Sequence, residues 1–155
     1  MILSFLQELA EYTQRTDQVK TTQRDLEQDG FCRNPFFHGI ISEVPEEHKS
    51  KEGYTIVAYS LYYFSYKSFT GRAVFMDDLY VMPEFRGNGI GKALMTKVAQ
   101  LGLAAGCKEL NFTVLAWNKP ARDFYSRQGC TDMTEESGSH YMSCKGDALE
   151  KLAKH

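Results

Sequence analysis

The stretch Arg86-Gly87-Asn88-Gly89-Ile90-Gly91-Lys92 decides how this 155-residue chain is read. It follows a run rich in β-branched and aromatic residues, Arg72–Val81, and it leads into a helical apolar pattern that ends near Gly106. Glycine lets a backbone adopt positive φ and come close to a ligand. The N–H groups at the start of a helix attract anions. The stretch therefore predicts a pyrophosphate cradle between a strand and a helix.

Two common phosphate motifs do not fit this loop. A dinucleotide fingerprint, G-x-G-x-x-G counted from Gly87, needs a glycine where Lys92 stands. A P-loop needs glycine at the position of Arg86 and serine or threonine at the position of Ala93. The pattern that remains is R-x-x-G-x-G. A glycine-rich turn without a ligand is the alternative, and the position between a strand and an amphipathic helix disfavours it.

Working outward from the loop, the apolar patterns predict an alternation of helices and strands. Strands are predicted at Phe36–Val44, Thr55–Phe64, Arg72–Val81 and Lys108–Ala116, with short candidates at Cys130–Met133 and Tyr141–Cys144. Helices are predicted around Ile2–Leu9, from Thr22 as a capping-box start to Gly30, from Ile90 to near Gly106, and at Pro120–Gln128 and Ala148–Lys154. The short links between the first three strands predict an antiparallel meander, and the strand–loop–helix–strand unit predicts a parallel crossover.

Length and composition limit the class of protein. A chain of 155 residues fits one domain, 1–155, and its 43% hydrophobic content permits a buried core. The net charge of −2 and the lack of a basic run disfavour nucleic acid, and no apolar stretch is long enough to span a membrane. The cysteines are scattered and the histidines lack the spacing of metal ligands. We therefore expect no metal, no disulfide framework and a reducing, cytoplasmic location.

Five segments resemble one branch of the GNAT N-acetyltransferases, the diamine (spermidine/spermine) acetyltransferases with their thialysine-acetylating relatives. These segments are NPFFH (34–38), TIVAYSLYYF (55–64), DDLYVMPEFRGNGIG (77–91), VLAWNKPARDFY (114–125) and QGCTDMTEE (128–136). The resemblance implies an α/β GNAT fold, with a central mixed, mostly antiparallel sheet and a βαβ crossover that binds acetyl-CoA. Family members usually begin with a strand before the first helix, and we expect that strand to be missing here.

The resemblance also implies an activity, which is transfer of the acetyl group of acetyl-CoA to a primary amine. The acceptor would be a small cationic amine, either a polyamine such as spermidine or spermine or a lysine-like amine such as thialysine. A protein amine as acceptor, and an acyl-CoA-binding module with weak catalysis, are the alternatives. The family likeness further implies a homodimer.

The resemblance assigns roles to individual residues of this chain. Tyr125 would protonate the departing CoA thiolate, and Asp77 would hold the cationic acceptor and draw off its proton through water. Acetyl-CoA would contact Leu79, Tyr80, Val81, Arg86, Gly87, Asn88, Gly89, Ile90, Gly91, Lys92, Asn118, Lys119, Pro120 and Ala121. The acceptor would contact Tyr12, Thr13, Asp77, Asn111, Phe112, Thr113 and Ser137.

Each of these assignments has an alternative of an ordinary structural kind. Tyr125, Tyr12 and Phe112 could be core aromatic residues, and Asp77 with Asp78 could be a solvent-facing acid pair. Neighbouring residues of a strand point to opposite faces, so we expect only one of the two aspartates to face the acceptor. The family typically has glutamate at the positions of Asp77 and Ser137, and both changes bear on acceptor specificity.

Overall fold

A four-stranded sheet in the order β1-β2-β3-β4 organises the larger of two compact units, residues 1–115. The computed structural model describes residues 2–12 and 14–154, and at residues 2, 8, 9 and 12 it describes the backbone alone. The strands are β1 (His38–Glu43), β2 (Ile56–Lys67), β3 (Gly71–Val81) and β4 (Glu109–Asn111), and the α-helices of this unit are α1 (Ile2–Tyr12), α2 (Gln23–Gly30) and α3 (Ile90–Ala104). Short 3-10 turns lie at η1 (Thr16–Gln18), η2 (Glu46–His48) and η3 (Pro83–Phe85).

The predicted topology is confirmed. β1 pairs with β2 and β2 with β3 in antiparallel fashion, which is the expected meander. β3 and β4 pair in parallel, with α3 as the crossover between them. This mixed, mostly antiparallel sheet places the glycine loop between the end of β3 and the start of α3, as the sequence predicts.

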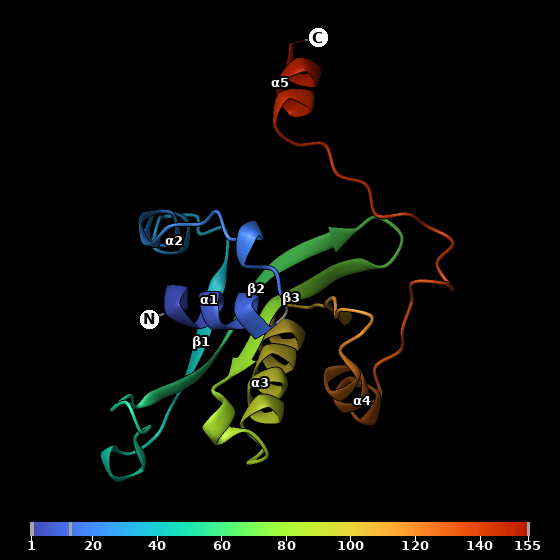
Figure 1. The fold of residues 1–155 in the computed structure, drawn as a ribbon. Helices are drawn as coiled ribbons and strands as arrows, with labels where there is room; N and C mark the ends of the chain where they lie inside the picture. The colour runs from blue at the N-terminus through green and yellow to red at the C-terminus, as the bar shows by residue number, and fades with distance from the viewer. Residues whose placement is uncertain (1, 13, 155) are drawn as a thin grey trace. The chain divides into compact units, whose positions relative to one another are not determined.

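β2 is buried on both faces because its β-branched and aromatic residues lie in the middle of the sheet. Val57, Ala58, Tyr59 and Ser60 are each 0% exposed. Successive strand residues point to opposite faces, so both faces of the sheet are covered at this point. The helices α1 and α3 both pack on β2 and β3 (Figure 1).

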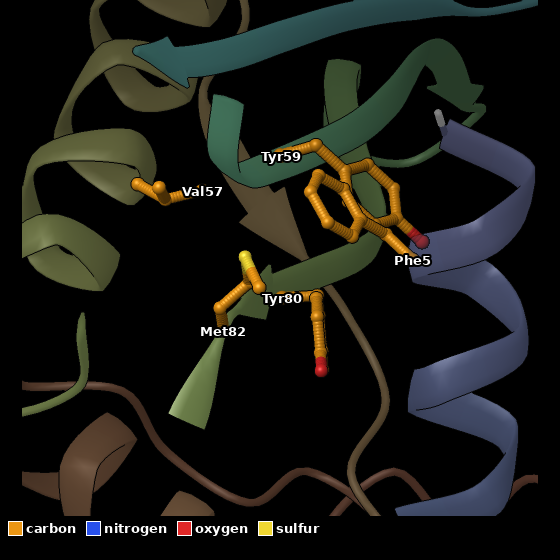
Figure 2. Packing of buried hydrophobic residues seen from close by; sticks show 5 residues of the cluster. All are labelled: Phe5, Val57, Tyr59, Tyr80 and Met82. Atoms are coloured by element: carbon orange, nitrogen blue, oxygen red, sulfur yellow. The ribbon is translucent and has the colours of Figure 1, made fainter. Parts of the chain in front are cut away.

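The core next to α1 is aromatic. Phe5, which lies on the apolar face predicted for the first helix, is 2% exposed and packs with Val57, Tyr59, Tyr80 and Met82. Figure 2 shows the Phe5 and Tyr59 rings lying over one another, and their centroids are 5.8 Å apart with planes 11° apart. The stacked rings tie α1 to the centre of the sheet.

The smaller unit, residues 116–155, contains α4 (Lys119–Arg127) and α5 (Asp147–Ala153), close to the two predicted helices. The two strands predicted at Cys130–Met133 and Tyr141–Cys144 are wrong, because neither segment forms a strand. The strand predicted at Lys108–Ala116 is also too long, because β4 covers only Glu109–Asn111. A β-rich segment becomes a strand only where a neighbouring edge supplies its ladder hydrogen bonds, and a sequence pattern does not reveal where such edges end.

The capping signal predicted for the start of α2 is confirmed. The capping box predicted at Thr22 is present: the Thr22 hydroxyl accepts a hydrogen bond from the Asp25 N–H, and the Asp25 carboxylate accepts one from the Thr22 N–H.

Among the described residues, no helix has the combination of length and apolar composition that crossing a bilayer requires.

Candidate functional site

The glycine loop has the backbone geometry expected of a phosphate cradle. Gly87 and Gly89 have φ values of 83° and 80°, in the left-handed region that side chains with a Cβ rarely adopt. A Cβ atom placed on either residue would have no neighbour within 4 Å, so the space above the loop is open. Gly89 is the N-cap of α3, and no side chain caps that helix end. The amide groups of the first turn of α3 therefore lack a side-chain partner and can receive an anion.

Arg86 and Gly91 join the loop to the end of β3. The Arg86 Nε donates a hydrogen bond of 2.9 Å to the carbonyl oxygen of Val81, and its guanidinium lies 5.6 Å from the centre of the Tyr80 ring. A Cβ atom on Gly91 would lie 3.7 Å from the Val81 side chain, so the first turn of α3 packs closely on the strand. The structure thus brings together the loop and the strand end that the family resemblance assigns to acetyl-CoA.

One edge of β3 is open next to this loop. β4 pairs with β3 only from Ala73 to Phe75 and ends at Asn111, whereas β3 continues to Val81. Leu79, Tyr80 and Val81 pair with β2 on their other side. Their outward backbone groups are thus beyond the reach of the β4 ladder, as predicted for a strand that receives an amide-containing chain.

Asn111 stands where the β3–β4 ladder ends. Its Nδ2 donates a 3.0 Å hydrogen bond to Glu109, while its Oδ1 is buried with no hydrogen-bond partner among the described atoms. Hydrogen bonds from Asn111, Lys67 and Thr70 lower the pKa of Glu109 to about 2. A buried, unpartnered acceptor is costly unless a ligand donor satisfies it, and this fits a site that binds an amide or an amine.

The neighbouring carboxylates Asp77 and Asp78 lie at a β-bulge. Leu61 pairs with Asp78 and the next residue, Tyr62, pairs with Met76, so Asp77 has no partner in the ladder. The strict alternation of faces, from which we expected the two side chains to point in opposite directions, does not hold across such an extra residue. Both carboxylate charges act on the hydroxyl of one residue, Tyr59.

The two carboxylates have different surroundings. Asp77 is exposed, and Asp78 is half-buried beside the aromatic core. Burial and the Asp77 charge raise the pKa of Asp78 to about 6, against the smaller opposite effect of a hydrogen bond from Tyr59. Desolvation also raises the pKa of Asp77. An acidic group that keeps its proton up to near-neutral pH is typical of a functional site.

In the smaller unit, Tyr125 lies half-buried on α4, where its ring meets Phe124 edge-on at 5.3 Å. Burial, followed by the charge of Cys130, raises the pKa of Tyr125 to about 12, so its hydroxyl keeps its proton over the whole physiological range. The α4 start carries an ion pair between Lys119 and Asp123 at 2.7 Å. Asn118, which is 9% exposed, has a buried Oδ1 with no hydrogen-bond partner among the described atoms.

The remaining residues predicted to contact the acceptor belong to several segments of the chain. Thr13 lies outside the described residues, and Tyr12, the last residue of α1, is described in its backbone alone. Phe112 is half-buried and Thr113 is exposed, directly after β4. Ser137 is exposed, and its hydroxyl oxygen accepts a 3.3 Å hydrogen bond from the Ser139 N–H.

The residue that the sequence analysis missed is Tyr59. Its ring belongs to the aromatic core and its hydroxyl donates a 3.2 Å hydrogen bond to Asp78. In the sequence it is one aromatic residue within a strand rich in them, and only the pairing of β2 with β3 brings it to the acid pair. Among the described residues, no group of three or more His, Cys, Asp or Glu side chains is arranged to hold a metal ion.

The chain is similar to known acetyltransferases. The model of the acetyltransferase (GNAT) family matches residues 3–130. Thialysine N-epsilon-acetyltransferase from Sus scrofa is 43% identical over 98% of this chain and 89% of its own length. Spermidine/spermine N(1)-acetyltransferase-like protein 1 from Homo sapiens is 32% identical over 98% of this chain and 22% of its own length.

Solved structures share the fold. An integron cassette protein from the mobile metagenome of V. cholerae superposes with a TM-score of 0.71 at 24% identity, covering 96% of this chain and 86% of its own. An aminoglycoside acetyltransferase from an uncultured soil metagenomic sample superposes with a TM-score of 0.69 at 16% identity, covering 94% and 88%. At such low identity these two likenesses concern the fold alone.

Proposed function

Because the chain belongs to the GNAT acetyltransferase family, we propose that it transfers the acetyl group of acetyl-CoA to the primary amine of thialysine or a closely related lysine-like amine. One observation mainly supports acetyl-CoA as the cosubstrate. The glycine loop leads into the start of α3, which no side chain caps, and it lies beside the part of β3 that β4 does not cover. The acceptor class rests on the relatives named for thialysine, of which one is 43% identical over nearly the full chain. Polyamines are a related acceptor class, named in a relative that is 32% identical.

Acetyl-CoA supplies the activated acetyl group, and the residues near its proposed site fit its chemical parts. The first-turn amides of α3, with Gly87 and Gly89, would hold the pyrophosphate. The part of β3 at Leu79–Val81, which β4 does not cover, would pair with amides of the pantetheine arm as an added strand does. The unpartnered oxygen of Asn111 offers a further acceptor for an N–H or O–H group.

The amine half of the reaction needs a negative charge and a proton acceptor. A primary alkyl ammonium has a pKa of about 10.4, so only about one molecule in a few thousand is neutral at pH 7. Asp77, exposed at the bulge, is placed to attract the cation. Tyr125 retains its proton and would donate it to the developing thiolate, while one backbone N–H at the end of β3 would stabilise the oxyanion.

A turnover assay with acetyl-CoA tests this proposal. The acceptor panel contains thialysine, lysine, spermidine, spermine, putrescine and a lysine-containing peptide, with release of free thiol as the signal. We expect the highest kcat/KM with thialysine. A preference for the peptide would mean a protein acceptor, and CoA binding without turnover of any amine would mean an acyl-CoA-binding module.

We further infer that the two compact units belong to one domain, because the family model spans residues 3–130 and so runs across their boundary at residues 115 and 116. Free thiols at all four cysteines suit a reducing, cytoplasmic location.

Fully or largely exposed aromatic side chains, such as Phe69 at 100% and Tyr66 at 74%, favour a homodimer that covers some of them. Light scattering that gave the monomer mass of 17.7 kDa at micromolar concentration would contradict the dimer.

A further inference from the structure

Asp78 is held on two sides by residues of β2. The Tyr59 hydroxyl donates a 3.2 Å hydrogen bond to Asp78 Oδ2, and the Ser60 hydroxyl donates a 2.8 Å hydrogen bond to the Asp78 carbonyl oxygen. Both Tyr59 and Ser60 are 0% exposed. The position of the carboxylate is therefore set by the core of the sheet, whereas the neighbouring Asp77 lies exposed at the unpaired residue of the bulge.

The anchor itself is rigid. The Tyr59 ring stacks on Phe5 of α1, with centroids 5.8 Å apart, and meets Tyr80 of β3 at 6.4 Å. These contacts leave the ring little rotational freedom and aim its hydroxyl at Asp78. A half-buried carboxylate held by a tyrosine of the aromatic core reduces stability, and such a cost is typical of groups kept for function.

The groups facing Asp78 define its proton balance. The titratable ones among the described side chains are Tyr59 on β2 and Asp77 on β3, with Tyr80 next to Tyr59. Around these tyrosines, the Phe5 ring of α1 packs on Tyr59 and Tyr80, and the Arg86 guanidinium lies over the Tyr80 ring. The two adjacent carboxylates oppose each other's ionisation, so the pair tends to hold one proton between them.

We propose that Asp78, anchored by the Tyr59 hydroxyl, receives the proton that the acceptor ammonium must lose, while Asp77 holds the ammonium by its charge. This division of labour rests on the proposed function. Asp77 has the exposure that a docking charge needs, and Asp78 has the fixed position that a proton acceptor needs. Tyr59 is a positioning residue, because it acts only through Asp78.

The proton step balances without any further reactant. An N–H bond of the ammonium breaks, its electron pair stays on nitrogen, and the proton moves to an Asp78 carboxylate oxygen directly or through one water. The neutral amine then forms the new C–N bond as the C–S bond of the thioester breaks; the nitrogen releases its second proton to water, and the departing CoA thiolate gains a proton from the general acid proposed above. Asp78 returns its proton to solvent before the next turnover. A carboxylate whose pKa is raised toward neutrality is a stronger base for this step than an ordinary aspartate.

The test is the pH dependence of kcat/KM for the best acceptor in wild type, Tyr59→Phe, Asp78→Asn and Tyr62→Phe. Tyr59→Phe removes a hydrogen bond that favours the Asp78 carboxylate, so the acid limb of its profile is expected to move up by about 0.5–1 pH unit. Asp78→Asn is expected to lose about 10²-fold or more in kcat with the KM for acetyl-CoA unchanged. Tyr62→Phe, which removes the hydroxyl of another buried tyrosine of the same strand, is the control and should keep the wild-type profile.

A second measurement separates the proposal from the activity. Carboxyl-carbon NMR titration of Asp78 should give a raised pKa in wild type and a higher one in Tyr59→Phe. A folded Tyr59→Phe whose rate profile and titration match wild type, or an Asp78→Asn with wild-type kcat, would overturn the proposal while leaving the acetyltransferase function standing. A wild type that acetylates none of the panel would overturn the proposed function, and this inference with it.

Discussion

Replacement of Asp78 by asparagine should stabilise the protein at neutral pH and leave its stability nearly unchanged in acid. The folded state raises the pKa of Asp78 from 3.8 to about 6, so between these values the folded protein binds more protons than the unfolded chain. The free energy of unfolding therefore falls as the pH rises through this window, and it stays lower above it. The asparagine carries no charge and keeps an oxygen that can accept the Tyr59 hydrogen bond.

The magnitude follows from the same pKa. Since one pKa unit corresponds to ~1.36 kcal/mol, the rise of the Asp78 pKa to about 6 is worth about 3 kcal/mol at pH 7.5. Solvent that still reaches the half-buried carboxylate reduces the expected gain to about 2 kcal/mol. Asp78→Asn should therefore exceed wild type by about 2 kcal/mol at pH 7.5 and by only about 0.5 kcal/mol at pH 4, near the unfolded-state pKa of 3.8.

Urea unfolding followed by circular dichroism at several pH values between 4 and 8 measures this difference. Asp25→Asn is the control of opposite sign, because the capping box lowers the pKa of Asp25 and its loss should destabilise the protein at pH 7.5. A difference between Asp78→Asn and wild type that does not change with pH would refute the reasoning. So would a variant that is less stable than wild type at pH 7.5.

Three further substitutions test other parts of the molecule. Gly89→Val should weaken CoA binding at least 10-fold in calorimetric titration, because valine resists a φ of 80° and fills the cradle; Gly53→Val, with a φ of 91° outside the loop, is the matched control for backbone strain. Tyr125→Phe should lower kcat by about 10–10²-fold at pH 7 and pH 9 alike, because a pKa of about 12 keeps the hydroxyl protonated at both; a wild-type kcat would mean a core role. Gly102→Ala should lower the free energy of unfolding in urea by about 1–3 kcal/mol, because its Cβ would lie 2.7 Å from the Val74 side chain. An unchanged free energy would show that α3 can shift away from β3 at this point without cost.

The local parts of the fold could be predicted because they depend on neighbours in the sequence. The capping box at Thr22 and the apolar face of α1 follow from spacing within one or two helical turns. The strands β2 and β3 follow from runs of β-branched and aromatic residues, and their short link implies the antiparallel pairing. The two strands predicted at 130–133 and 141–144 are absent, because a strand also needs a pairing partner that is distant in the sequence.

The candidate site divides in the same way. The glycine loop could be located from its residues alone, because positive φ and close approach are intrinsic properties of glycine. The sequence also marked Asp77 and Asp78 as a pair, but it predicted opposite directions from strand alternation. The bulge that cancels this alternation depends on how Leu61 and Tyr62 pair across the sheet, and no local pattern announces it.

The order of the helices and of the four strands of the sheet, the crossover and the position of the glycine loop were thus determined by the sequence itself, through periodicity and the conformational freedom of glycine. The tertiary structure alone decided which carboxylate is buried and which tyrosine reaches it. Tyr59 and Asp78 are 19 residues apart in the chain, and the β2–β3 register brings them within 3.2 Å. A raised pKa likewise comes from burial in an assembled core, and that environment exists only in the folded protein.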